Sequence, residues 1–367
     1  MNHIIIAHLY NPGSAATNRI LAFAKGYAQL DLAVSLVLGC ENEELLPELS
    51  GVEVSKVTSK THVGLFRKMA KTIKQLYVHG RSVIQIYGSP VLCLYLPQTK
   101  YNIFFECTEV PFYGKKKTLK NWSKETIKRW LTKRATGVIV ISKALWHYFK
   151  NEGVKNIEIV NMFVDAERFD KALDNPKEKY VAYCGKISLF KDGVDCLIRA
   201  FQFFYRQHQD YRLWIIGGFE NEETEKQLKQ MVQSLQIEDA VKFVGQVRPE
   251  DMPSMLKSAQ MLALARPDNE QAKYGFPTKL GEYLATGKPV VVTRVGEIGD
   301  FLTDGINCRM ANPDDPKDFT EKMDWVANHY EEAKELGKEG KHLTYNVFSS
   351  LEQCKEALAF MNRTSKS

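Results

Sequence analysis

Two lysines in a loop bracketed by glycines form one arrangement in this sequence that could do chemistry. Lys186 and Lys191 stand five positions apart between Gly185 and Gly193, after an apolar run and before a helical pattern. Paired ammonium groups can stabilise a departing diphosphate where its charge develops. The loop alone leaves a second interpretation open, in which two exposed lysines lie on an ordinary turn.

A second stretch could bind an anion at the start of a helix. Pro277 suits the first turn of a helix, where its missing N–H needs no partner. The amides of Gly275 and Phe276 would then face an anion near the positive helix end. Glu282, one to two turns further on, could accept hydrogen bonds from a ribose diol. An ordinary helix after a buried strand is the alternative.

The first half of the chain offers a small-residue loop over residues 10–17. It contains Asn11 and Gly13 and leads into a helix expected to begin at Asn18. Such a loop can approach a ligand closely and present a helix N-terminus to an anion, or it can be a plain strand–helix turn. It does not match the dinucleotide-binding glycine pattern or a P-loop.

Two carboxylates are expected after the strand-like run 103–106. Glu106 and Glu109 lie three positions apart. One of them could accept the proton of an acceptor hydroxyl or bind a sugar. A purely structural role is the alternative.

Apolar runs alternate with helical-period segments along the whole chain, which predicts α/β domains with parallel sheets covered on both faces. Strands are expected at 4–8, 33–38, 83–87, 103–106, 137–141, 180–184, 213–217, 241–244, 261–265 and 289–293, and helices at 18–30, 195–208, 222–235 and 315–328. Ligands of such sheets bind at the carboxyl ends of strands, so the candidate loops are those that follow strands.

The length of 367 residues fits two domains. An irregular stretch at 161–179 marks the expected boundary, giving an N-terminal domain over 1–162 and a C-terminal domain over 163–344. The helical pattern within 345–367 could pack on either domain, and we expect it on the first.

Composition favours a globular protein of a reducing compartment. Hydrophobic residues make up 44% and charged residues 26% of the chain, and no apolar run approaches the roughly 20 residues that span a bilayer. The seven cysteines include no Cys-x-x-Cys pair, which argues against a disulfide framework. The first residues are typical of a strand and not of a secretory signal. We therefore expect a cytoplasmic protein.

Positive charge is concentrated in residues 55–134, which carry a net +14, whereas the rest of the chain carries −8. Two helical stripes within this window mix apolar and basic residues, at 64–78 and 115–134. Such surfaces suit anionic lipid headgroups, at about 1 kcal/mol for each basic residue near the membrane. Docking of the apolar faces on a sheet is the alternative, favoured for 64–78 and left open for 115–134. The apolar residues of the stripes are Phe66, Met69, Ile73 and Leu76, and Leu119, Trp122, Thr126 and Trp130.

The motifs of residues 137–330 together resemble the donor-binding domain of retaining glycosyltransferases of family 4. The matching segments are Gly185-Lys186 with Lys191 and Gly193, Gly245-Gln246-Val247, Gly275-Phe276-Pro277 with Glu282, Gly287-Lys288-Pro289, Gly296-Glu297, Asp304-Gly305, and a linker with Asn161, Asp165 and Phe169. The resemblance implies the GT-B fold, in which two Rossmann-like domains face an active site in the cleft between them.

The resemblance also implies roles for individual residues. Lys186, which replaces the family's usual arginine, and Lys191 would contact the donor diphosphate, and Glu282 would hold the ribose. Tyr274 stands where the family has an acid that touches the transferred sugar. No histidine follows the strand at 103–105, where many members have one. The implied donor site comprises Gly185, Lys186, Lys191, Gly217, Gln246, Val247, Arg248, Tyr274, Gly275, Phe276, Pro277, Lys279 and Glu282; the catalytic candidates are Lys186, Lys191, Glu106 and Glu109; and the acceptor-side loop contributes Asn11, Gly13 and Asn18.

These residues predict a retaining glycosyltransferase that moves a sugar from a nucleotide-diphosphate sugar to a glycan or lipid-linked acceptor in cell-surface polysaccharide synthesis. The sequence has no Asp-x-Asp motif, so we expect neither a metal nor another cofactor. The basic window predicts peripheral contact with the anionic inner face of a membrane. A sugar-nucleotide epimerase or a glycosyl phosphorylase is the main alternative. A nucleic-acid-binding protein is a remote one, because no reading motif accompanies the basic window.

Overall fold

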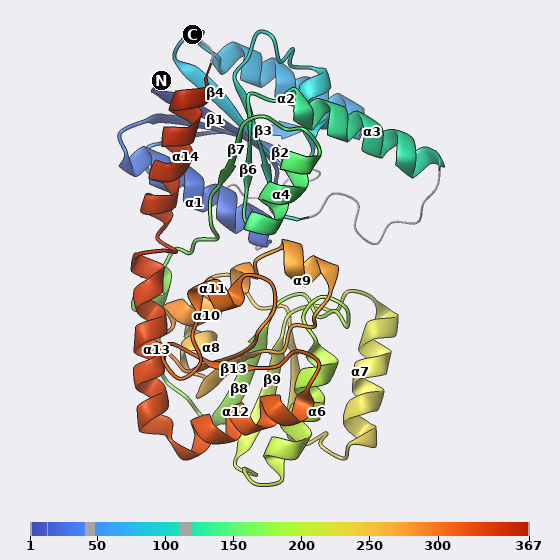
Figure 1. Ribbon diagram of the computed structural model, residues 1–367, viewed down its shortest axis with the longest axis vertical. Coiled ribbons are helices and arrows are strands. Elements are labelled where there is room, and N and C mark those ends of the chain that lie inside the picture. Colours follow the sequence, from blue (N-terminus) through green and yellow to red (C-terminus); the bar gives the residue numbers. More distant parts are fainter. Residues whose placement is uncertain (1, 13, 41–47, 110–118, 366–367) are drawn as a thin grey trace. The chain divides into compact units, whose positions relative to one another are not determined.

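The chain forms two compact units, one comprising residues 1–163 and 350–367 and the other residues 164–349. The computed structural model describes residues 2–12, 14–40, 48–109 and 119–365, with the backbone alone at 119–125 (Figure 1). We call the first of the two compact units unit 1 and the second unit 2.

Unit 1 is built on a parallel sheet of order β3-β2-β1-β4-β5-β6-β7. Its strands are β1 (His3–Leu9), β2 (Ala33–Cys40), β3 (Val52–Thr58), β4 (Ser82–Tyr87), β5 (Ile103–Cys107), β6 (Gly137–Val140) and β7 (Ile157–Ile159). Its helices are α1 (Ala15–Gln29), α2 (His62–Leu76), the 3-10 turn η1 (Pro90–Leu94), α3 (Leu119–Lys133), α4 (Lys143–Asn151) and α14 (Ser350–Thr364).

The first helix begins earlier than the sequence pattern predicts. The side chain of Ser14 accepts a hydrogen bond from the amide of Thr17 and so caps α1 at Ala15, three residues before the predicted start at Asn18. A serine followed by two alanines makes a good helix start although it is not part of the apolar stripe.

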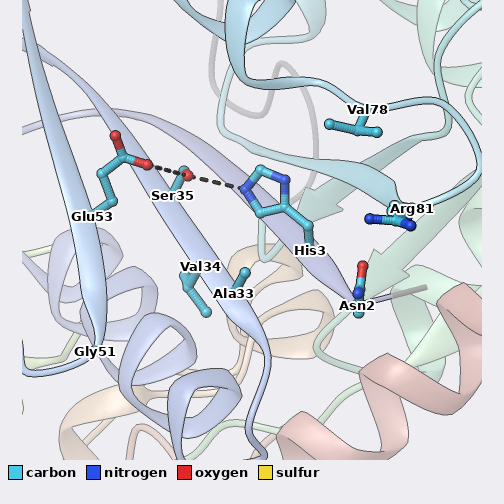
Figure 2. A pocket seen from close by; sticks show the side chains of 9 residues that line it. All are labelled: Asn2, His3, Ala33, Val34, Ser35, Gly51, Glu53, Val78 and Arg81. Carbon is cyan, nitrogen blue, oxygen red and sulfur yellow. Dashed lines mark hydrogen bonds between the residues drawn. The ribbon is translucent and has the colours of Figure 1, made fainter.

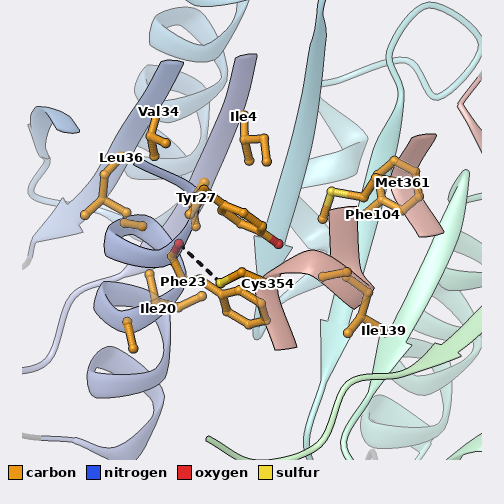
Figure 3. Packing of buried hydrophobic residues seen from close by; sticks show 14 of the residues in the cluster. Ile4, Ile20, Phe23, Tyr27, Val34, Leu36, Phe104, Ile139, Cys354 and Met361 are labelled. Atoms are coloured by element: carbon orange, nitrogen blue, oxygen red, sulfur yellow. Dashed lines mark hydrogen bonds between the residues drawn. The ribbon is translucent and has the colours of Figure 1, made fainter. Parts of the chain in front are cut away.

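The C-terminal helix α14 completes the core of unit 1. Cys354, Phe360 and Met361 are buried beside residues of α1 and of the central strands (Figure 3). Gly26 of α1 permits this contact, because a Cβ there would lie 2.4 Å from the Cys354 sulfur. Each large buried side chain contributes about 1.5–3 kcal/mol, so α14 is an integral part of this unit.

Unit 2 is built on a second parallel sheet, of order β10-β9-β8-β11-β12-β13, which is the strand order of a Rossmann fold. Its strands are β8 (Lys179–Cys184), β9 (Tyr211–Ile216), β10 (Val241–Gly245), β11 (Met261–Leu264), β12 (Val290–Thr293) and β13 (Arg309–Ala311). Its helices are α5 (Glu167–Asp170), α6 (Val194–Tyr205), α7 (Glu222–Ser234), α8 (Met252–Lys257), α9 (Glu270–Tyr274), α10 (Thr278–Ala285), α11 (Ile298–Phe301), α12 (Pro316–Asn328) and α13 (Tyr330–Tyr345). The predicted α/β class, with a parallel sheet in each of two domains, is confirmed.

Candidate functional site

Three loops of unit 2 meet at the carboxyl ends of β8, β9 and β10. The amide of Gly185 donates to the Ile216 carbonyl at 2.9 Å, and the amide of Gly217 donates to the Gly245 carbonyl at 2.8 Å. These bonds continue the sheet beyond its strands. They bring together Gly185, Gly217 and the loop that begins with Gln246, Val247 and Arg248, all of them predicted members of one donor site.

Two glycines allow these loops to approach so closely. Gly217 has a φ of 136°, and a Cβ there would lie 2.0 Å from the Gly185 carbonyl oxygen. Gly193 has a φ of 63°, and its Cβ would lie 2.0 Å from the Ala265 carbonyl oxygen. Any side chain at either position would both strain the backbone and collide with it. The loop 185–193 is therefore fixed between the ends of β9 and β11.

A buried ion pair stabilises the loop 185–193. The carboxylate of Asp192, only 2% exposed, lies 2.5 Å from the Lys279 ammonium nitrogen. The Tyr183 hydroxyl donates to the same carboxylate oxygen at 2.8 Å. Burial alone would raise the pKa of Asp192, but the Lys279 charge, helped by Arg266, outweighs burial and holds the pKa below its usual range.

This pairing gives Lys279 a contact that the sequence does not reveal. The resemblance assigns Lys279 to the donor site, and its ammonium does lie at the donor loop, because a Cβ on Gly185 would come within 2.2 Å of its nitrogen. Its charge, however, is already neutralised by Asp192. Asp192 and Lys279 are 87 positions apart in the chain, and the residues between them give no indication that the two side chains pair.

The two candidate phosphate-binding lysines lie on the surface of the braced loop. Lys186 is exposed and Lys191 is half-buried. Between them, the Phe190 carbonyl accepts a hydrogen bond from the Asn269 side chain at 2.8 Å, which ties the loop to the start of α9. The backbone between the two lysines is therefore held in place.

The start of α10 differs in one respect from the prediction. The Gly275 amide donates to the Gln271 carbonyl at 3.0 Å and closes α9, so it does not face an anion in this structure. The Phe276 side chain is buried and packs edge-to-face on Phe301. Pro277 is the N-cap of α10, one position before its predicted place in the first turn, and Tyr274 is half-buried at the end of α9.

Glu282 lies on α10, close to the loops already described. Its side chain is 23% exposed, and Oε1 is 3.9 Å from a guanidinium nitrogen of Arg168 on α5. Burial raises the pKa of Glu282, while Arg168 and Lys279 act against this rise. The neighbouring Tyr283 hydroxyl accepts a hydrogen bond from the Cys184 amide at 2.6 Å, which fixes α10 to the end of β8.

The predicted base-flanking segment lies on the loop after β10. Gln246 and Arg248 are exposed and Val247 is half-buried. Arg248 forms an ion pair with Asp251 at 2.8 Å, three residues further along the same loop. This segment meets the loop after β9 through the backbone contact between Gly245 and Gly217 and through the Gln246 side chain, which lies against Gly218.

The acceptor-side candidates of unit 1 lie at the carboxyl end of β1. The Asn11 amide donates to the Thr17 hydroxyl at 3.2 Å, and the buried His8 ring nitrogen Nε2 lies 3.0 Å from the same oxygen. Burial lowers the pKa of His8 to about 4. Asn18 lies in the first turns of α1, and Gly13 lies outside the described residues.

The structure does not bring Glu106 and Glu109 together. Glu106 lies within β5, not after it, and is buried in an ion pair with Arg19 at 2.5 Å. Its other carboxylate oxygen accepts a hydrogen bond from Gln85 at 2.9 Å. Glu109 is exposed. A fully buried carboxylate with both oxygens bonded in the core does not fit the predicted contact with an acceptor hydroxyl.

A hollow of about 450 Å³ lies at the opposite, amino ends of β1, β2 and β3 (Figure 2). His3 bonds two serines there: Nε2 lies 3.0 Å from the Ser35 hydroxyl, and Nδ1 lies 2.9 Å from that of Ser82. Ser35 in turn donates to Glu53 at 3.0 Å. No residue of the predicted site lines this hollow. Among the described residues, no group of three or more His, Cys, Asp or Glu side chains is placed to hold a metal ion.

The strand order of unit 2 is that of a Rossmann-like domain, and unit 1 is a second α/β unit with a parallel sheet. Two solved structures share this fold over nearly the whole chain. Sucrose-phosphate synthase from Thermosynechococcus elongatus has a TM-score of 0.78 and 14% identity and covers 99% of both chains. The Anabaena protein Alr3699/HepE, solved in complex with UDP-glucose, has a TM-score of 0.75 and 16% identity and covers 97% of this chain and 99% of its own. The fold is GT-B, as predicted.

The sequence comparisons identify the domain. Residues 164–343, nearly all of unit 2, match the family model described as glycosyl transferases group 1. Mannosylfructose-phosphate synthase of Agrobacterium fabrum is 27% identical over 210 residues, which cover 53% of this chain. The chain spans 45% of the length of that relative. Nearly all of unit 2 therefore resembles a group 1 glycosyltransferase domain.

Proposed function

We propose that this protein is a retaining glycosyltransferase of family 4, which moves a sugar from a nucleotide-diphosphate sugar to a glycan or lipid-linked acceptor in cell-surface polysaccharide synthesis. The observation that supports it best is the meeting of the Lys186–Lys191 loop with the loops after β9 and β10, beside Glu282. The neighbouring Anabaena structure holds UDP-glucose, and the Agrobacterium relative is named as a sugar-phosphate synthase, which agrees with a nucleotide-sugar donor.

The proposed chemistry places positive charge at the leaving group. The bond between the anomeric carbon and the phosphate oxygen breaks, a bond forms between that carbon and the acceptor oxygen, and the acceptor's proton passes to the released diphosphate. Lys186 and Lys191 stabilise the diphosphate as its charge develops, and the positive end of α10 adds to this field. Since these groups supply the charge, we propose that no divalent cation is required, and the rate should be unchanged in EDTA.

Glu282→Gln should lower kcat/KM about 10- to 100-fold, because a neutral amide replaces a carboxylate in hydrogen bonds worth about 1.5–3 kcal/mol. The nucleotide for this assay is selected first: it is the one of UDP, GDP and ADP that raises the melting temperature of the protein most. Release of that nucleoside diphosphate from its sugar donor is then measured with and without acceptor. Glu238→Gln, an exposed carboxylate on the loop before β10, is the matched control.

Unchanged kinetics in Glu282→Gln would remove the ribose assignment. The products also separate the proposed reaction from related ones. An epimerase leaves the nucleotide attached, a phosphorylase needs inorganic phosphate, and the proposed transferase releases nucleoside diphosphate only when an acceptor is present.

The proposal includes peripheral contact with an anionic membrane through residues 55–134. No helix in the described part of the chain has the length and apolarity to span a bilayer. On α2, Leu65, Met69 and Ile73 are buried in unit 1, so this apolar face is docked, with Phe66 and Leu76 half-buried at its border, while the basic residues of the helix are exposed. On α3, Ile127 and Trp130 are 47% and 52% exposed. The basic residues of α2 and of the C-terminal part of α3 with the residue after it are Arg67, Lys68, Lys71, Lys74, Lys128, Arg129, Lys133 and Arg134.

The double variant Lys71→Gln/Lys74→Gln should bind phosphatidylglycerol vesicles about 30-fold more weakly at low salt, since each basic residue contributes about 1 kcal/mol. Co-sedimentation of the purified protein with vesicles gives the partition coefficient. Lys226→Gln/Lys229→Gln, which removes two exposed lysines of α7, is the control. Equal binding by both double variants would contradict the membrane assignment.

A further inference from the structure

The short helix α5 is held rigidly although it has only four residues. The Lys257 ammonium of α8 donates to the Phe169 carbonyl at 2.9 Å and to the Ala172 carbonyl at 3.1 Å. The Asp170 carboxylate accepts from Lys341 of α13 at 2.7 Å. The Phe169 ring is fully buried. Two other helices of unit 2 therefore fix the position of α5 and of the side chains that leave it.

The Arg168 side chain extends from α5 and lies near both the base-flanking loop and α10. One guanidinium nitrogen donates to the Pro249 carbonyl at 3.0 Å, and the other lies 3.9 Å from Glu282 Oε1. The first contact orients the planar guanidinium, and the second places its charge beside the carboxylate. About a third of the Arg168 side chain is exposed, so the contact is not sealed from water.

We propose that Arg168 is a positioning residue for the donor nucleoside, which holds the Glu282 carboxylate ready to accept hydrogen bonds from the ribose diol. This inference rests on the proposed function, because it takes the ribose to bind at Glu282. A carboxylate can accept from both hydroxyls of a diol, whereas its protonated form has lost part of that capacity. Arg168 itself needs no contact with the nucleotide.

The charges around Glu282 show why an arginine is needed there. The titratable groups that interact with it are Arg168 from α5, Lys279 and Tyr283 from its own helix and the Cys184 thiol of β8. Both cations oppose the effect of burial on the pKa of Glu282, and Arg168 has the larger effect because Lys279 is also paired with Asp192. Removing Arg168 should raise the pKa of Glu282 further and protonate it at a higher pH.

The test compares binding of the chosen nucleoside diphosphate with that of its 2′,3′-dideoxy analogue by isothermal titration calorimetry. In Arg168→Ala, affinity for the nucleoside diphosphate should fall about tenfold at about pH 6 and less at about pH 8, because protonation of Glu282 is the cause. Affinity for the dideoxy analogue should change less than about twofold, since it lacks the diol. Arg168→Lys should recover part of the loss, and Arg199→Ala, an exposed arginine on α6, is the control.

A double-mutant cycle decides whether Arg168 acts through Glu282. In the Glu282→Gln background, Arg168→Ala should cost less than about twofold in affinity. Equal losses for the nucleotide and its dideoxy analogue, or additive losses in the double variant, would overturn the inference and leave the proposed function intact. If Glu282→Gln itself binds the nucleotide as the unmodified protein does, the ribose assignment fails instead.

Discussion

Asp192→Ala is expected to lower the free energy of unfolding of unit 2 by about 3–5 kcal/mol and to reduce transfer at least 100-fold. Removing one member of a buried ion pair leaves the other charge without a partner, which accounts for a loss of this size. The Lys279 ammonium would then lie uncompensated against the backbone at Gly185, and the Tyr183 hydroxyl would keep only its longer contact, with the Lys186 carbonyl, of the two acceptors that it has here. Urea unfolding and steady-state kinetics give the two quantities.

The double variant Asp192→Asn/Lys279→Met separates the pair from its surroundings. Because both charges are removed together, it should recover most of the stability that Asp192→Ala loses. Recovery of stability without recovery of transfer would show that the pair serves the loop 185–193 rather than the fold alone. If Asp192→Ala is as stable as the unmodified protein, the pair does not brace the loop.

The same pair predicts a particular response to acid. Its partner cation holds the pKa of Asp192 below the usual value, so the carboxylate releases its proton more readily in the folded than in the unfolded chain. The resulting stability is complete above the unfolded pKa of about 3.9 and is lost as the pH falls toward the lower folded pKa. Asp192→Asn should therefore flatten the acid limb of the stability curve.

Arg19→Ala is expected to destabilise unit 1 by about 3–5 kcal/mol, again because a buried carboxylate, here Glu106, is left without its cation. Arg19 also donates to the carbonyls of Val160 and Asn161 and lies 4.5 Å from the centre of the Phe163 ring. It therefore fixes the last residues of unit 1 before the chain enters unit 2.

Hydrogen exchange locates the effect of Arg19→Ala. Amides of β1, β4 and β5 should exchange faster, while those of β8, β9 and β11 keep their protection, because the partners of Arg19 named above, Glu106, Val160, Asn161 and Phe163, belong to unit 1. Arg67→Ala, an exposed arginine on α2, should leave both sets unchanged. Uniform loss of protection in both units would contradict a local role for the pair.

The strands of both central sheets could be predicted because they are apolar throughout. In a parallel sheet covered on both faces, such runs as 4–8 and 180–184 have few other stable positions. Three of the four edge strands lack this pattern, the exception being β10, which was predicted at 241–244. The edge strand β3 alternates polar and apolar residues, and β7 and β13 have three residues each, so no strand was expected at any of them.

Helix α13 escaped prediction for a different reason. It contains Gly337 and Gly340, which usually argue against a helix interior. A Cβ at Gly337 would lie 2.4 Å from the Gly287 carbonyl oxygen, and one at Gly340 would lie 2.8 Å from the Leu284 side chain. The glycines let α13 pack closely on α10 and the turn after it, a need that only the tertiary structure reveals.

The loops of the candidate site were predictable, but the contacts among their side chains were not. Gly185 and Gly193 mark a tight loop after a strand, because the backbone adopts a positive φ at both positions. Nothing local distinguishes Lys279, paired with Asp192, from a lysine that binds a donor. Glu106 illustrates the same limit, since a carboxylate at the end of an apolar run reads as exposed unless its partner Arg19 is known to lie opposite.

The order of the chain in unit 1 has a consequence for how the protein is made. Side chains of α14 complete the core on which α1 packs, and the whole of unit 2 lies in the sequence between the first part of unit 1 and α14. A ribosome delivers the N-terminal residues first. Unit 2 therefore emerges with every strand it needs while unit 1 still lacks its final helix. During that interval the apolar face of α1 stays open to water, and we expect nascent-chain chaperones to bind there.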